Sequence, residues 1–234
     1  MKTTGLAVAL SLLLAGAAQA APASNATADN ALAIAKRAIA FRSVQGPGNQ
    51  TPELARYLKQ LFVEAGFADA DVTVEPVDDT AYLLLRWRGT DPKARALVIS
   101  GHMDVVEAKP ADWQRDPFTP IVENGYLFGR GATDMKLDLA LVTATVIDLK
   151  RAGYKPKRDL ILAFSGDEET TMKTSAILAS KVKGAEMVLN VDGGGGQLGE
   201  DGKPRFFSVS AAEKTYADFQ LEVTNPGGHS SAPR

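Results

Sequence analysis

Acidic and histidine residues follow several short apolar or glycine-rich stretches of this 234-residue chain, and this pattern most constrains its fold. The stretches, with the residues that follow them, are 94–101 with His102 and Asp104, 129–133 with Asp134, 159–166 with Asp167, Glu168 and Glu169, and 188–191 with Asp192. Short apolar strands suit a sheet that is buried on both faces. Polar side chains at the ends of such strands are typical of a site at one edge of an α/β sheet.

Hydrophobic periodicity predicts helices that alternate with strands. We expect helices over 29–41, 51–66, 136–152 and 172–182, strands over 72–77, 81–87, 97–100, 160–164, 186–191, 205–209 and 216–223, and a hairpin over 121–128 that turns at Asn124 and Gly125. On the helix over 136–152, the expected apolar side is Leu137, Leu141, Val142, Thr145 and Leu149. Residues 193–196, all glycine, are expected to form a flexible turn. This alternation predicts an α/β fold, a three-layer sandwich with a largely parallel central sheet.

Composition excludes some functional classes. Hydrophobic residues make up 45% of the chain and charged residues 23%, with a net charge of -2, as in an ordinary folded protein. Mixed charges of this kind argue against a nucleic-acid surface or a polybasic membrane patch. The chain has no Cys, so disulfides and thiolate metal ligands are both excluded.

The first twenty residues differ from the rest. Lys2 precedes the apolar residues 6–17, and Ala18-Gln-Ala20 is a small-x-small cleavage site. We interpret residues 1–20 as a secretory signal peptide, because the apolar stretch is short for a membrane span. The protein is therefore expected to be exported, periplasmic or secreted, without a membrane anchor after cleavage.

Taken one by one, the polar residues allow ordinary structural roles. His102 could be a core histidine, Asp134 a helix N-cap, and Asp192 a turn former. The carboxylates of 167–169 could form an acidic helix start. Together they favour divalent cations, because adjacent carboxylates repel one another unless a positive charge offsets them.

Six motifs together resemble the dinuclear zinc aminoacylase and carboxypeptidase family, which includes acetylornithine deacetylase, succinyl-diaminopimelate desuccinylase, glutamate carboxypeptidases and carnosinase-like dipeptidases. The motifs follow the family's order over residues 100–231: Ser100-Gly-His-Met-Asp104, Asp112-Trp-Gln-Arg-Asp-Pro-Phe-Thr-Pro120, Gly129-Arg-Gly-Ala-Thr-Asp-Met-Lys136, Ser165-Gly-Asp-Glu-Glu169, Asp192, and Gly227-Gly-His-Ser-Ser231. The resemblance implies a zinc-exopeptidase-like fold.

The resemblance also implies roles for individual residues. His102 and Asp192 would bind one zinc ion, Glu169 would bind the second, and Asp134 would bridge the two ions. Asp104 would orient His102, and Glu168 would be the general base that activates a metal-bridging water. His229 would help hold the oxyanion. The implied cofactors are two Zn²⁺ ions, although Co²⁺ or Mn²⁺ also suits such ligands.

The chain departs from the family in two respects. The family completes its second zinc site with a later histidine, whereas His102 and His229 are the two histidines here. The family also inserts a lid domain after the Asp192 region, and this chain ends soon after His229. We therefore interpret the chain as an N-terminal fragment: a signal peptide over 1–20, a catalytic domain over 21–211, and the start of a lid and dimerisation domain over 212–234. Little activity is expected from residues 21–234 alone.

The leading hypothesis is an exported, zinc-dependent metallohydrolase of the exopeptidase or carboxypeptidase type. Its substrates would be small peptides or N-acyl amino acids, and the resemblance implies a homodimer through the lid in the full-length protein. An N-acyl-amino-acid deacylase is the alternative enzyme. A truncated, inactive protein that binds metal or peptide is the non-enzymatic alternative.

Overall fold

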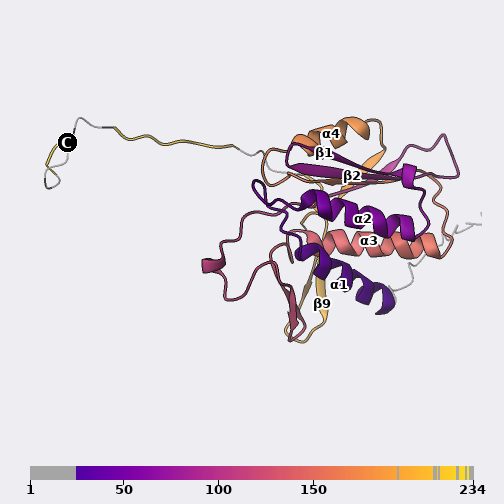
Figure 1. Ribbon diagram of the computed structural model, residues 1–234, viewed down its shortest axis with the longest axis horizontal. Coiled ribbons are helices and arrows are strands. Elements are labelled where there is room, and N and C mark those ends of the chain that lie inside the picture. The colour runs from indigo at the N-terminus through magenta and orange to yellow at the C-terminus, as the bar shows by residue number, and fades with distance from the viewer. Residues whose placement is uncertain are drawn as a thin grey trace, which may run out of the picture. The chain divides into compact units, whose positions relative to one another are not determined.

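A computed structural model describes residues 25–193, 195–212, 215, 217–224, 227–229 and 231 (Figure 1). The expected signal peptide, residues 1–20, lies outside these residues. The chain divides into two compact units between Gly193 and Gly194, and each is described here by itself. The domain boundary expected near residue 211 stays a prediction. Among the described helices, none is both long and apolar enough to cross a membrane.

The first unit is built around a five-stranded sheet with the order β1-β2-β6-β3-β7. Its strands are β1 (Val72–Val77), β2 (Thr80–Trp87), β3 (Leu97–His102), β6 (Leu160–Ser165) and β7 (Met187–Asn190). β3 pairs in parallel with both β6 and β7, while β2 is antiparallel to both β1 and β6. Only β2 therefore opposes the common direction, which confirms the largely parallel sheet.

Helices cover both faces of this sheet, so the first unit has three layers (Figure 1). On one face, α1 (Asn25–Ile39), α2 (Thr51–Glu64) and α3 (Lys136–Arg151) share one apolar core with the strands. On the other face, Leu178 of α4 (Lys173–Lys181) packs with Tyr82, Val98, Ile161 and Ala163. The predicted α/β sandwich is confirmed.

The buried side of α3 agrees with the predicted one only in part, since Leu137, Val142 and Leu149 are half-buried against the core. Its buried positions are Lys136, Leu139, Ala140, Thr143, Ala144, Val146 and Ile147. Leu141, by contrast, is exposed. Small side chains explain the difference, because Ala140 and Ala144 of α3 and the buried alanines of α1 let these two helices pack closely. Size, rather than hydrophobicity alone, decided which side of α3 faces inward.

Several element boundaries also shift. α1 (Asn25–Ile39) contains the expected cap Asp29 within it, and α2 begins at Thr51 with Gln50 as its N-cap. Short 3₁₀ turns occur at Asp69–Asp71 and Pro110–Asp112. The expected hairpin is present, with β4 (Ile121–Glu123) antiparallel to β5 (Tyr126–Phe128).

The second unit contains a small antiparallel pair, β8 (Gly195–Leu198) and β9 (Pro204–Ser208). β8 takes up part of the glycine run for which a flexible turn was expected. The strand expected over 216–223 is wrong for the described residues 217–224, which are irregular and exposed. A strand needs a neighbour for its backbone N–H and C=O groups, and no described strand pairs with this segment.

Candidate metal centre

The parallel strands bring three of the polar segments to one edge of the sheet. His102, the last residue of β3, is in register with Ser165 of β6, so the segment 167–169 begins beside it. Ser100 of β3 is in register with Asn190 of β7, which places Asp192 on the other side. Asp134 comes from the loop that precedes α3. The structure therefore gathers His102 with the three predicted carboxylate ligands and with Glu168, the predicted base.

His102 is buried, with only 1% of its surface exposed. Its Nδ1 lies 3.0 Å from the backbone carbonyl oxygen of Asp104. A carbonyl can only accept, so Nδ1 is the protonated nitrogen. The other nitrogen, Nε2, lies 3.0 Å from Asp134 Oδ1 and 3.6 Å from Asp192 Oδ2. The ring thus presents Nε2 to two carboxylates, as a metal ligand would.

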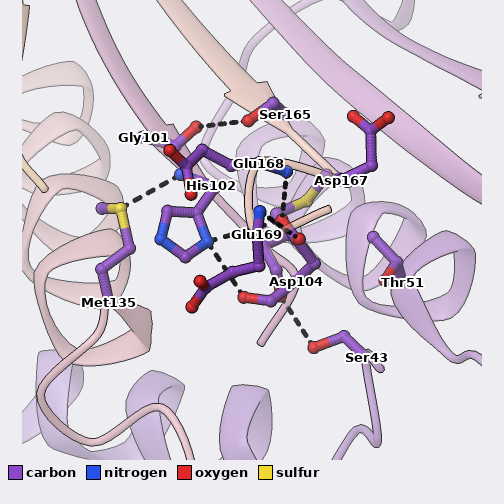
Figure 2. Close-up of polar contacts among 12 residues, drawn as sticks. Ser43, Thr51, Gly101, His102, Asp104, Met135, Ser165, Asp167, Glu168 and Glu169 are labelled. Carbon is purple, nitrogen blue, oxygen red and sulfur yellow. Dashed lines mark hydrogen bonds and ion pairs between the residues drawn. The ribbon is translucent and has the colours of Figure 1, made fainter. Parts of the chain in front are cut away.

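Asp104 does more than the predicted orientation of His102. That orientation comes mainly from its backbone carbonyl, since its carboxylate oxygen Oδ1 is 3.4 Å from Nδ1. Figure 2 shows that the carboxylate instead accepts hydrogen bonds from the backbone N–H groups of Glu168 and Glu169, at 3.1 and 3.0 Å. Asp104 therefore ties the end of β3 to the segment that carries both glutamates.

Among the residues that the structure describes, two sets of side chains have the spacing of metal ligands. The first is His102, Glu168 and Asp192, and the second is His102, Asp134 and Glu169. Within each set, one ligand atom per residue lies within 4.8 Å of the others. The sets differ from the expected assignment, because Glu168, rather than Asp134, accompanies His102 and Asp192. The geometry thus allows Glu168 either to bind metal or to transfer protons.

The electrostatics of the site favour a cation. Burial by itself lowers the pKa of His102, but the hydrogen bond and charge of Asp104, with the charges of Asp192 and Asp134, raise it to about 9. Burial raises the pKa of Glu168, Glu169 and Asp192, and neighbouring carboxylates add to the increase. A bound divalent ion would relieve this repulsion, so the donor set fits a metal.

Asp134 does not have the helix-capping role that a single aspartate before a helix could have. Met135, not Asp134, is the N-cap of α3, and it makes no side-chain capping bond. The side chain of Asp134 is 59% exposed and points to His102. Asp167 has a capping role at a different helix, α4. Its carboxylate accepts hydrogen bonds from the backbone N–H groups of Lys173 and Thr174 at the start of that helix.

Sequence patterns missed several residues around the site. Met135 is fully buried, and its sulfur lies 3.0 Å from the backbone nitrogen of His102 (Figure 2). Asp138 lies in the first turn of α3, and burial and the charges of Asp192 and Asp134 raise its pKa. Lys136 and Ser43 are fully buried polar residues. Only the Asp-Met-Lys run around Met135 carried a signal, as part of a motif.

A cavity adjoins the site. The cavity, of about 460 Å³, is lined by His102, Glu168 and Asp192 together with residues of β3, β7 and α4.

His229 lies in the second unit, where its Nδ1 is 2.7 Å from Ser231 Oγ. Its expected role at the oxyanion stays a prediction.

Comparison with known proteins identifies the family. Residues 98–227 match the sequence profile of peptidase family M20/M25/M40, and this range contains both sets of candidate metal ligands and Asp104. The chain belongs to this family. The resemblance deduced from the six motifs is thereby confirmed, and with it the assignment to a family of peptidases and related amidohydrolases.

Curated relatives of this M20 chain include hydrolases of two kinds. It is 30% identical to the N-fatty-acyl-amino acid synthase/hydrolase PM20D1 of Mus musculus over 204 residues, which cover 83% of this chain and 40% of that protein. It is 32% identical to the probable carboxypeptidase S-like 2 of Dictyostelium discoideum over 165 residues, 65% of this chain and 31% of that protein. The chain thus spans well under half of these relatives.

Solved structures share the fold. The M20 family metallo-carboxypeptidase Sso-CP2 from Sulfolobus solfataricus matches with a TM-score of 0.61 and 23% identity, over 76% of this chain and 40% of that one. The di-peptidase Dug1p from Saccharomyces cerevisiae matches with a TM-score of 0.59 and 23% identity, over 75% and 40%. At this identity the likeness concerns the fold alone.

Proposed function

We propose that this M20 chain carries the metal-binding part of an exported zinc hydrolase that cleaves amide bonds in small peptides or N-acyl amino acids. One observation carries the proposal: the Nε2 atom of buried His102 faces Asp134 and Asp192, and Glu168 and Glu169 lie at ligand distance. Carboxylates gathered around one buried histidine repel one another and need a compensating positive charge, and histidine with carboxylates is the donor set that zinc accepts when thiolates are absent.

The residues that would hold zinc are His102, Asp192, Asp134 and Glu169. When bound, zinc supplies a Lewis acid that polarises the scissile carbonyl and lowers the pKa of water. The protein's own part is to position these ligands. Asp104 contributes without being a ligand itself. Its carbonyl fixes the His102 ring, and its carboxylate holds the backbone N–H groups of Glu168 and Glu169.

We assign proton transfer to Glu168. Its carboxylate lies in one set with His102 and Asp192, close enough to reach a water molecule held there. A half-buried glutamate in that place can accept a proton from water and return it to the leaving amine. Glu169 lies in the other set, with His102 and Asp134, and we assign it the ligating role that the family resemblance implies.

Two substrate classes remain, and each has support from a relative. The carboxypeptidase relatives support a peptidase, and PM20D1 supports a hydrolase of N-acyl amino acids. Both reactions break an amide bond through attack of water on a carbonyl. A panel of dipeptides and N-acyl amino acids, assayed with the protein isolated from its host, separates the two.

Matched glutamate variants test the assignment. Glu168→Gln should keep its zinc content but lose roughly a hundredfold or more in kcat. Glu169→Gln should lose zinc, and Glu53→Gln, an exposed change on α2, should alter neither. Turnover that survives a chelator would overturn the proposal. Zinc binding without turnover of any substrate in the panel would favour a metal-binding protein that lacks activity.

Export is a separate part of the proposal, supported by the composition of residues 1–20. Cleavage after Ala20 predicts a mature protein that begins at Ala21-Pro-Ala. Amino-terminal sequencing of the protein from its host tests this directly. An intact Met1 in the mature protein would contradict export by this route.

A further inference from the structure

Ser43 lies in the loop between α1 and α2, outside the motifs that point to the metal centre. It is fully buried. Its hydroxyl donates a hydrogen bond to the carbonyl of Met103 at 2.7 Å, and its own carbonyl accepts one from the N–H of Val105 at 2.9 Å. Ser43 is therefore bonded to the residues on both sides of Asp104, as Figure 2 shows in part.

The segment that contains Ser43 is itself anchored. The Nζ atom of Lys136, which is fully buried at the start of α3, donates to the carbonyl of Phe41 at 2.8 Å. Gly131 leaves room for the lysine stem, because a Cβ at this position would lie 2.9 Å from Lys136 Cδ and 3.0 Å from Val105 Cγ1. Phe41 to Ser43 are thus held against the backbone of 103–105.

Asp104 connects this anchored backbone to the residues of the metal centre. Its carbonyl sets the ring of His102, and its carboxylate holds the backbone of Glu168 and Glu169. A shift of the 103–105 backbone would therefore move the ligands of both sets together. Ser43 makes two of the hydrogen bonds that prevent such a shift.

We propose that Ser43 is a positioning residue of the metal centre, which acts through Asp104. The inference deepens the proposed function and rests on it for the purpose of the site. Its structural content, that Ser43 fixes Asp104 and hence the Glu168 and Glu169 backbone, can be measured without any metal.

The test compares Ser43→Ala with Thr143→Val. Thr143 is also fully buried, and its hydroxyl also donates to a backbone carbonyl, that of Leu139 at 2.8 Å within α3. Both changes delete a buried hydroxyl, but only the first touches the 103–105 backbone. Amide hydrogen exchange of the metal-free 234-residue chain is followed residue by residue by NMR, with core amides of α2 as the reference for global opening.

Ser43→Ala should speed exchange at Glu168 and Glu169 about fivefold to tenfold relative to the reference amides, as expected for the loss of a buried hydrogen bond. Thr143→Val should leave that ratio unchanged. Equal ratios in the two variants would overturn the proposal. If Ser43→Ala does not fold, Lys136→Met is measured in its place. This variant removes the hydrogen bond to Phe41 and should also speed exchange at Glu168 and Glu169, by a smaller factor.

Zinc affinity, measured by competition with a chelator, separates this inference from the proposed function. A Kd raised several-fold in Ser43→Ala but not in Thr143→Val supports both. Altered exchange in a chain that binds no zinc keeps the positioning role and refutes the hydrolase. Unaltered exchange with normal zinc binding refutes the positioning role alone.

Discussion

The Nδ1 atom of His102 lies 3.0 Å from the backbone carbonyl oxygen of Asp104, and this contact determines what the other ring nitrogen can do. With the proton on Nδ1, Nε2 faces Asp134 at 3.0 Å and Asp192 at 3.6 Å. A lone pair between two carboxylates is unfavourable, so Nε2 carries a proton or a metal ion. Proton and metal therefore compete for the same atom.

Zinc binding should release a proton from His102. Its pKa is raised to about 9, so Nε2 is protonated at about pH 7 in the metal-free chain. We expect the apparent zinc affinity to rise by up to about tenfold per pH unit between about pH 6 and about pH 8. Calorimetry in buffers of different ionisation enthalpy measures the released proton. Identical binding enthalpies in all buffers would contradict the competition.

The metal-free chain should be less stable in alkali. The pKa of His102 is raised in the folded state from 6.5 to about 9, so the protonated ring stabilises the fold. This contribution is complete below pH 6.5 and disappears as the pH rises through about 9. We expect the free energy of unfolding to fall by roughly 3 kcal/mol over that interval. Urea unfolding measures it, and His102→Gln should show a smaller decrease.

Asp104→Asn should damage the site more than its small change in shape suggests. Each carboxylate oxygen accepts a backbone N–H, from Glu168 or Glu169, and the amide would turn an NH₂ group toward one of them. We expect a loss of about 2 kcal/mol in stability, with weaker zinc binding. Asp159→Asn is the control, because Asp159 accepts from the N–H of Gly89 but takes no part in the metal sets. Normal zinc affinity in Asp104→Asn would refute this role.

Asp167→Ala should destabilise the turn into α4. Burial raises the pKa of Asp167, but hydrogen bonds from the Thr171 and Thr174 hydroxyls and from the Thr174 and Lys173 N–H groups outweigh it and lower the pKa. Loss of these bonds should cost about 2–4 kcal/mol, as seen by thermal unfolding. Asp116→Ala, which removes similar local bonds at an exposed site, should change the melting temperature little. Equal effects of the two changes would contradict the assigned cap.

Gly166→Ala should be far more harmful than Gly101→Ala. A Cβ on Gly166 would lie 2.1 Å from the Ala81 backbone oxygen, whereas a Cβ on Gly101 would first meet the end of the Met135 side chain, at 2.5 Å. The first contact is with rigid backbone, and the second with a flexible thioether that can move. We expect at least about 3 kcal/mol for Gly166→Ala and about half of that for Gly101→Ala. Chemical denaturation of both variants checks the order.

Much of the site could be predicted because its residues follow strands. Periodicity locates β3, β6 and β7, and parallel strands bring their carboxyl ends to one edge. His102, Glu168, Glu169 and Asp192 were recognisable from that rule and from their motifs. Asp134 was found through its motif, although as a single residue it was better explained as a helix cap.

Other features had no local signal. The inward side of α3 depends on which side chains are small enough to meet α1, and a pattern of apolar residues does not measure that fit. The strand expected over 216–223 had suitable alternation, yet alternation supplies no pairing partner.

Residue type and short-range periodicity were thus sufficient to identify the α/β alternation, the family motifs and the carboxylates available for a metal, since these are properties of neighbouring residues. Long-range contacts were needed to show which carboxylates share His102 and which hydroxyl supports Asp104. Ser43 and Met103 are 60 positions apart, and Asp104 and Glu168 are 64 apart. Contacts over such separations depend on how the helices and the sheet pack, which no local window of the sequence contains.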